Sequence, residues 1–377
     1  LLRVQQVLTP SVGAAVLDRL WAQAAPDRGA LDDVVIEAKR LVVDDVQAAE
    51  VDRLMRLVRR ILPDLDQASA RRALEALLVA MDRYRAYVVP GRAVDPEQAA
   101  VIEAAAGRAR AHLAPTDEPA LGVIVDLVLD RDLRDAALDT GPLADDFRVR
   151  FQQTCGPVMA KGIEDTAYYR WFRLAGANEV GGHPDHLSIS AEEFHTWCGQ
   201  LVASWPTSMT TLTTHDTKRS EDVRARLMSL AEDGEGWATW VARARVLGDA
   251  HRPALVDAPT EYLLWQTLVG AWPITGPRLH RYALKPVRRA RLEEYLLKAV
   301  REAKVHTAWV DGDTDYEDAV TSYARDLTHD PLVQSHLDAW TVAHEPSVRA
   351  NVLAQKLIQL TMPGVPMIYY GEEIGMR

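Results

Sequence analysis

The chain has 377 residues, of which 48% are hydrophobic, so it can bury at least one sizeable core. Its 43 basic and 54 acidic residues give a formal net charge of −11, which argues against a nucleic-acid partner, because tracking phosphates needs a basic surface. Two cysteines, Cys155 and Cys198, exclude a disulfide scaffold, and no run of about 18 apolar residues suggests a membrane span. Reduced thiols then indicate a cytoplasmic protein.

The first part of the chain reads as a succession of helices. Residues 31–62 contain Ala, Leu, Arg and Glu without Gly or Pro, and their apolar residues recur near the 3.6-residue period. The same pattern predicts helices over 66–88 and 95–114, the last with Asp95 as N-cap before a first-turn proline. We therefore expect a helical bundle or a helical insertion with no visible chemistry, and we assign residues 1–145 to this subdomain.

Aromatic residues and glycines mix in the next part, "FQQTCGPVMAKGIEDTAYYRWFRLAGANEVGGHPD", residues 151–185. This composition predicts loops and short helices that line a site. Carboxylates and lysines bind sugar hydroxyls, and aromatic faces stack on pyranose rings, so the pattern suits carbohydrate binding by Lys161, Glu164, Asp165, Tyr169 and Trp171. A surface helix with an aromatic core side explains the same pattern equally well.

A helix with a capping box at Ser190 and Glu193 follows, and we assign 146–205 to a substrate-lining segment and the helix that leads onward. The stretch "SMTTLTT", residues 208–214, predicts a strand that ends directly before His215 and Asp216.

A helix capped at Ser220 comes after that strand, and a helix over 350–362 precedes a second apolar strand, "GVPMIYYG", residues 364–371. In (β/α)8 barrels the catalytic groups lie at the C-terminal ends of the strands. We therefore predict an α/β fold in which His215 and Asp216 lie at the mouth of a parallel barrel.

Asp216 is the candidate catalytic residue, since glycoside cleavage needs carboxylates that stabilise an oxocarbenium-like transition state and bind the 2-hydroxyl. The alternative is that Asp216 only caps the following helix. His183 and His186 are poorly spaced for a metal site and have no evident third ligand, so we predict no metal. Dinucleotide and P-loop motifs are also missing from the sequence, and no cofactor is expected.

Two stretches, 151–182 and 209–226, resemble in order and spacing the maltooligosyltrehalose synthases of the α-amylase family of glycoside hydrolases. This resemblance implies a (β/α)8 barrel, of which 206–377 is the C-terminal portion with strands seven and eight, joined to the large helical insertion of residues 1–145. The site of such a barrel uses three carboxylates, of which Asp216 matches the transition-state stabiliser. It also implies sugar-binding roles for the residues matching the family's "HDTKR" and "AKGxED" patterns, namely His215, Lys218, Arg219, Lys161, Glu164 and Asp165. The nucleophile and the acid/base have no counterpart here, so the resemblance implies a fragment that lacks an N-terminal barrel half and is inactive alone.

The implied reaction is an intramolecular transglycosylation in trehalose biosynthesis, which converts the reducing-end α-1,4 linkage of a maltooligosaccharide to an α,α-1,1 linkage. One departure is "PGVPMIYYGEEIG", where Tyr370 and Glu372 replace the family's Gln and Thr and resemble hydrolytic relatives. A hydrolytic α-glucosidase or α-amylase is therefore an alternative, and a non-catalytic helical carbohydrate-binding fragment is another. Neither nucleic acid nor membrane is expected as a partner.

Overall fold

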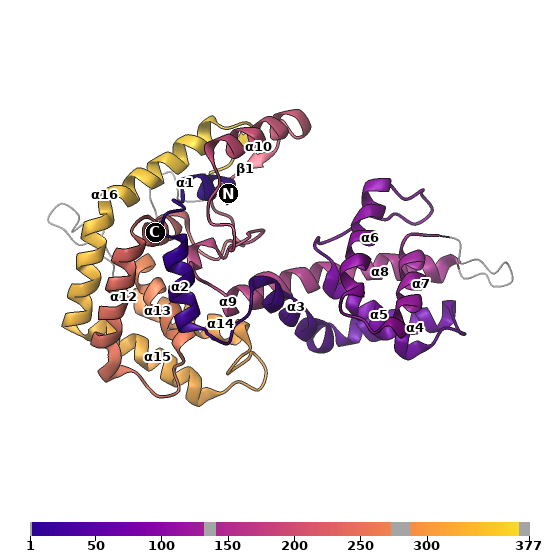
Figure 1. Ribbon diagram of the computed structural model, residues 1–377, viewed down its shortest axis with the longest axis horizontal. Helices are drawn as coiled ribbons and strands as arrows, with labels where there is room; N and C mark the ends of the chain where they lie inside the picture. Colours follow the sequence, from indigo (N-terminus) through magenta and orange to yellow (C-terminus); the bar gives the residue numbers. More distant parts are fainter. Residues whose placement is uncertain (1, 132–140, 273–286, 369–377) are drawn as a thin grey trace. The chain divides into compact units, whose positions relative to one another are not determined.

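The computed structural model describes residues 2–131, 141–272 and 287–368 (Figure 1). The chain divides into a smaller unit, Gly29–Ala167, and a larger unit made of Leu1–Arg28 with Tyr168–Arg377. These bounds differ from the predicted segment ends at 145 and 205. The smaller unit extends to Ala167 because α8 and η3, which run from Gly141 to Ala167, belong to it.

The smaller unit is helical throughout its described length. Its elements are α3 (Leu31–Leu41), the π-helix η1 (Val42–Val46), α4 (Ala48–Ile61), α5 (Gln67–Ala80), α6 (Pro96–Arg110), the 3-10 helix η2 (Pro115–Asp117), α7 (Glu118–Val128), α8 (Gly141–Met159) and the π-helix η3 (Ala160–Ala167). Fully buried side chains from α4, α5 and α8, among them Leu54, Leu74 and Phe147, form its core. The predicted helical character of this region is confirmed.

Two of the predicted helices are wrong in detail. The helix expected over 31–62 is interrupted by η1, after which Gln47 leaves helical geometry with φ −106° and ψ 9°. The helix expected over 66–88 ends at Ala80. The predicted cap of the third helix is confirmed, because the Asp95 carboxylate accepts a hydrogen bond from the Glu97 amide at 2.8 Å.

Lys39 is a buried lysine that joins three elements of the smaller unit. From α3 its ammonium donates to the carbonyl oxygens of Val79, at 3.2 Å, and Met81, at the end of α5. Its side chain packs against Gly162 of η3, where an added Cβ would lie 2.6 Å from the Lys39 Cγ. Burial lowers the pKa of Lys39 to about 8, although Asp82 opposes the shift.

This pKa predicts a pH dependence of stability. Between pH 8 and 10.5 the unfolded chain keeps the Lys39 proton that the folded chain has lost, so the free energy of unfolding should rise with pH by about 1.4 kcal/mol per unit. Buried Cys155, whose pKa is raised by burial to about 12, acts in the opposite direction above its ordinary value of 9.0. We therefore expect denaturant titrations in a Cys155→Ala background to show the rise, and Lys39→Met to abolish it. An equal slope in the two proteins would contradict the assignment.

The larger unit packs its helices around tryptophan and tyrosine side chains. Its helices are α1 (Leu2–Leu8), α2 (Ala14–Ala24), α9 (Tyr168–Arg170), η4 (Ala175–Ala177), α10 (Ala191–Ser204), α11 (Glu221–Glu232), α12 (Gly234–Gly248), η5 (Asp249–His251), α13 (Ala258–Ala271), α14 (Val287–Ala303), α15 (Thr314–His329) and α16 (Pro331–Thr361). In the core, the ring of Trp237 stacks on Trp240 with centroids 5.1 Å apart and donates a hydrogen bond to the Tyr262 hydroxyl at 3.4 Å. The predicted capping box of α10 at Ser190 and Glu193 is confirmed.

Two short parallel strands, β1 (Met209–Thr210) and β2 (Val365–Pro366), pair in the larger unit. The Val365 amide donates to the Ser208 carbonyl at 2.8 Å. Gly364 permits this approach, because its φ is 118° and an added Cβ would lie 2.6 Å from the Ser208 oxygen.

The predicted strand over 208–214 is thus wrong in length. Side-chain hydrogen bonds compete with strand pairing there, since the Thr211 hydroxyl donates to the Thr213 carbonyl at 2.7 Å. Of the second predicted strand, residues 369–371 lie outside the described residues. Apart from β1 and β2 the described residues form helices and loops, so the large helical part is confirmed and the predicted barrel is not evidenced among these residues. None of the described helices has the length and apolarity that crossing a bilayer requires.

Candidate functional site

His215 and Asp216 lie on the loop that follows β1, and both side chains face solvent. The imidazole Nε2 is 3.3 Å from the Asp216 carboxylate, and the two side chains are 81% and 70% exposed. The Asp216 amide donates to the Thr214 hydroxyl at 3.3 Å. Such a pair can offer a carboxylate and an imidazole to an incoming ligand.

The alternative role of Asp216 as the cap of α11 is wrong. The N-cap position is Ser220, as predicted, but the Ser220 hydroxyl donates to the Asp222 carboxylate and makes no capping hydrogen bond. The exposed Asp216 carboxylate is therefore not the N-cap of α11.

The loop that carries Asp216 rests on a buried ion pair that the sequence interpretation missed. Glu179 and Arg224, both almost completely buried, are 3.6 Å apart. The Glu179 carboxylate accepts hydrogen bonds from the amides of Lys218, at 2.6 Å, and Arg219, at 3.2 Å. One indication was available in the sequence, because Arg224 is in helical phase with the apolar Leu227 and Ala231.

Arg219 turns toward α14. Its guanidinium donates to the Tyr295 hydroxyl at 2.5 Å and lies 5.6 Å from the centre of that ring. Burial lowers the pKa of Arg219, but Tyr295, Tyr169 and Glu179 together raise it above its ordinary value. Arg219 therefore keeps its positive charge close to Asp216. The neighbouring Lys218 is held through its backbone amide, which donates to Glu179.

The predicted sugar-stacking rings of Tyr169 and Trp171 are buried in the larger unit. Trp171 packs edge-on against Trp21 of α2, with ring centroids 6.1 Å apart, and its carbonyl accepts from the Asn178 side chain at 2.5 Å. These rings form the aromatic core side that we gave as the alternative interpretation. Their role in lining a sugar site stays a prediction.

The "NEVGG" turn places Asn178 and Glu179 between these rings and the Asp216 loop. Gly181 has φ 69°, and an added Cβ on Gly182 would lie 2.7 Å from the Glu179 carbonyl oxygen. Only glycines therefore allow the sharp turn that directs Glu179 inward.

Lys161, Glu164 and Asp165 belong to the smaller unit, where they lie on η3. In place of the expected loops and short helices, α8 runs to Met159 and continues as this eight-residue π-helix, as the alternative of a helix here had it. Lys161 pairs with Asp165 at 2.6 Å, and the Tyr84 hydroxyl donates to Glu164. π-Helices occur often at functional sites, which favours a functional role for this cluster.

The two groups of predicted residues thus fall in different units. His215, Asp216, Lys218, Arg219 and Tyr169 come together in the larger unit, and Lys161, Glu164 and Asp165 come together in the smaller one. Among the described residues, no three His, Cys, Asp or Glu side chains are grouped as metal ligands. The rings of His183 and His186 are 6.4 Å apart.

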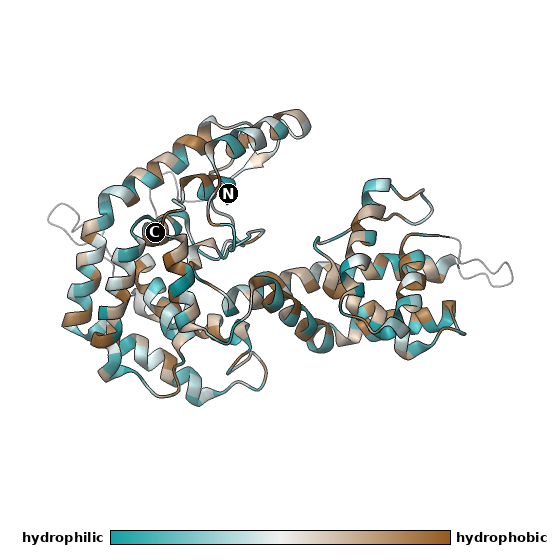
Figure 2. Ribbon diagram, in the orientation of Figure 1, coloured by the Kyte–Doolittle hydropathy of each residue, from teal (hydrophilic) through white to brown (hydrophobic). Residues whose placement is uncertain are grey.

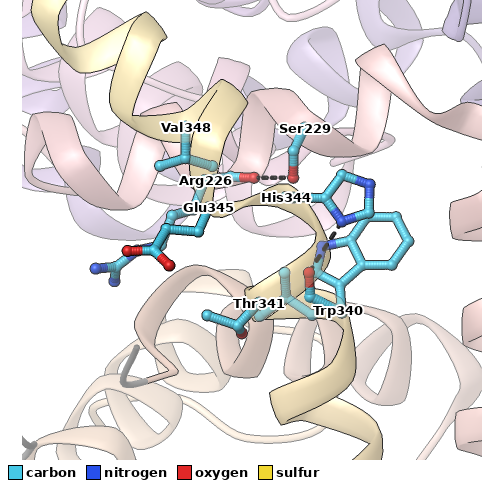
Figure 3. A pocket seen from close by; sticks show the side chains of 8 residues that line it. Arg226, Ser229, Trp340, Thr341, His344, Glu345 and Val348 are labelled. Carbon is cyan, nitrogen blue, oxygen red and sulfur yellow. Dashed lines mark hydrogen bonds between the residues drawn. The ribbon is translucent and has the colours of Figure 1, made fainter. Parts of the chain in front are cut away.

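A small pocket of the larger unit lies away from these residues. Figure 3 shows it between α11 and α16. The rings of Trp340 and His344 stack there, with their centroids 3.9 Å apart. Its lining consists of Arg226, Ser229, Val269, Trp340, Thr341, His344, Glu345 and Val348. No predicted site residue contributes to it, so the pocket and the Asp216 loop are separate features.

Comparisons with known proteins agree on one family, although no family model matches the chain. Proteins from Mycobacterium tuberculosis strains CDC 1551 and H37Rv, both provisionally named maltooligosyl trehalose synthase, are 34% identical to it over 98% of this chain. The structure of maltooligosyltrehalose synthase from Arthrobacter ramosus matches with a TM-score of 0.83 and 35% identity, over 100% of this chain. A glycosyltrehalose synthase, DSM5389, matches with a TM-score of 0.72 and 26% identity, over 98% of this chain and 42% of its own. The chain spans 44% of the length of the M. tuberculosis and A. ramosus proteins.

Proposed function

We propose that this chain, which belongs to the maltooligosyltrehalose synthase family, supplies the transition-state-stabilising carboxylate of an intramolecular transglycosylation in trehalose biosynthesis. The supporting observation is Asp216, which is exposed beside His215 on the loop that follows β1 of the parallel pair. Buried Glu179 accepts a hydrogen bond from the Lys218 amide of this loop. The substrate is a maltooligosaccharide, and the product carries an α,α-1,1 linkage at its former reducing end. The free, buried thiol of Cys155 suits a cytoplasmic location.

In the proposed mechanism, a carboxylate from outside this chain attacks the anomeric carbon beside the terminal glucose, and a carboxylic acid protonates the leaving oxygen. The two groups are about 5 Å apart in this retaining geometry. The freed glucose turns, and its anomeric hydroxyl attacks the glycosyl-enzyme while the second carboxylate takes the hydroxyl proton. Water must be kept out, because it would compete for the same intermediate.

Asp216 binds the 2-hydroxyl more strongly in the transition state than in the ground state, as acceleration requires. His215, Lys218 and Arg219 bind neighbouring hydroxyls. The Tyr169 and Trp171 segment is the proposed wall that holds the freed glucose. Lys161, Glu164 and Asp165 of the smaller unit are proposed to bind sugar hydroxyls. Carboxylates and bound sugar suffice for this chemistry, and no metal or cofactor is assigned.

We further propose that β1 and β2 are two strands of a (β/α)8 barrel whose other strands belong to a part of the protein outside this chain. Exposed leucines support the proposal, because Leu353, Leu357 and Leu360 of α16 follow one helix face at 70%, 64% and 57% exposure. Figure 2 shows apolar segments along this helix among polar ones. Val365 and Ile368 at β2 are exposed as well, and contiguous apolar surface of this kind marks an interaction site.

This surface predicts that the chain by itself self-associates. Leu353→Glu with Leu357→Glu should make the isolated chain more monomeric in sedimentation velocity, and should weaken assembly or turnover when the rest of the enzyme is present. Val246→Glu is the matched control, because Val246 is a single exposed apolar residue of α12 at 66% exposure. Equal behaviour of the two variants would contradict an interface at α16.

Product analysis tests the proposed function. The complete enzyme, incubated with maltopentaose, should yield a non-reducing oligosaccharide with little new reducing sugar. The 377-residue chain by itself is expected to be inactive, because the proposed mechanism takes the nucleophile and the acid/base from outside it. Rising reducing sugar as the main outcome would instead establish hydrolysis, which the "IYYGEEIG" segment favours and most of which lies outside the described residues.

A further inference from the structure

Two buried charged residues hold the loop that carries Asp216 from both of its ends. We propose that Glu179 and Arg224 are positioning residues that fix the Asp216 carboxylate for the reaction, although neither touches substrate. The inference rests on the proposed function of Asp216 and adds to it the part of the fold that sets its place.

Glu179 holds the outgoing end of the loop. One carboxylate oxygen accepts from the Lys218 amide at 2.6 Å and from the Val180 amide at 3.0 Å. The other accepts from the Arg219 amide at 3.2 Å. Hydrogen bonds to a charged acceptor are stronger than neutral ones, so this single buried carboxylate fixes two consecutive residues of the loop.

Arg224 holds both ends. From α11 its guanidinium donates to the carbonyl of Leu212, which precedes His215 and Asp216, and to the carbonyl of Arg219, which follows them. It also lies 3.6 Å from Glu179, which balances its charge in the interior. The pair therefore fixes the backbone on either side of His215 and Asp216.

Within the part of the chain that the structure describes, the hydrogen bonds around the exposed His215 and Asp216 are local. Threonine hydrogen bonds shape the turn, since the Thr217 hydroxyl donates to the Thr214 carbonyl at 2.8 Å, but they join the loop only to itself. A catalytic carboxylate must be held to within a fraction of an ångström, and a small misplacement can cost about 100-fold in rate. The buried pair is the element that supplies this precision.

Glu179→Gln in the complete enzyme is the test. Glutamine keeps the shape and one acceptor oxygen, but its amide nitrogen cannot accept from a second backbone N–H and cannot balance Arg224. We expect kcat to fall about 10–100-fold with KM little changed. Independently of activity, hydrogen–deuterium exchange at the amides of Lys218 and Arg219 should become faster by about the same factor.

Glu261→Gln is the matched control. Glu261 is also a buried carboxylate of the larger unit, 2% exposed, and it lies 3.5 Å from Arg245 and 3.4 Å from Arg252. It has no contact with the loop among its hydrogen bonds and ion pairs, which run to Tyr323 and these two arginines. Glu261→Gln should lower the free energy of unfolding about as much as Glu179→Gln does. It should leave kcat and the amide exchange of Lys218 and Arg219 as in the parent enzyme.

The outcomes separate the two proposals. Unchanged exchange at Lys218 and Arg219 in Glu179→Gln would overturn the positioning role, whatever the turnover. An equal fall of kcat in both glutamine variants would also overturn it, since general destabilisation would then explain the loss. A third result is a rise of exchange in Glu179→Gln, as expected, while Asp216→Asn keeps the parent turnover. That result would refute the catalytic role of Asp216 and would still show that Glu179 orders the loop.

Discussion

Asp216→Asn is expected to lower kcat of the complete enzyme by about 10²–10³-fold while leaving its fold intact. The asparagine side chain keeps the size of the carboxylate but removes the negative charge that would stabilise a developing oxocarbenium ion and bind the 2-hydroxyl. Because the Asp216 side chain is 70% exposed and makes no helix cap, the free energy of unfolding should change by less than about 0.5 kcal/mol. Initial rates on maltopentaose, with denaturant titrations alongside, measure both quantities.

Asp185→Asn provides the matched control for this prediction. Asp185 and His186 form another exposed, adjacent carboxylate–imidazole pair in the larger unit, 3.5 Å apart. If exposure and a neighbouring histidine were enough to affect turnover, both variants would lose it. Parent-like kcat in Asp185→Asn together with a large loss in Asp216→Asn would assign the effect to the loop after β1. Parent-like kcat in Asp216→Asn would remove Asp216 from the mechanism.

Arg224→Leu is expected to lower the free energy of unfolding by about 3–5 kcal/mol, the usual effect of breaking a buried ion pair by removing one partner. Leucine leaves the Glu179 carboxylate buried without its counter-charge. It also leaves the carbonyls of Leu212 and Arg219 without their shared donor. Urea titration of the complete enzyme measures the change.

An exposed ion pair gives the comparison for Arg224. Arg19 and Glu235 are 3.1 Å apart with side chains 50% and 74% exposed, so Arg19→Leu should cost no more than about 1 kcal/mol. A loss in Arg224→Leu as small as that would mean that solvent reaches the Glu179 site. The buried pair would then not support the loop as described.

Local features could be predicted from the sequence. The caps at Asp95 and Ser190 were predictable because a capping side chain bonds an amide only two or three residues away. A strand before His215 and Asp216 was predictable because β-branched residues favour extended backbone, but its end at Thr210 and not at Thr214 was not.

Tertiary structure decided the features whose partners are distant in sequence. The length of β1 depends on its pairing with β2, where the Val365 amide donates to the Ser208 carbonyl. The Asp216 loop depends on Glu179, which accepts hydrogen bonds from amides 39 and 40 residues away. The burial of Trp171 depended on its packing against Trp21. Propensity and spacing report on contacts within a few residues, so the ion pair beneath Asp216 became visible only once the folded chain had brought Glu179 and Arg224 together.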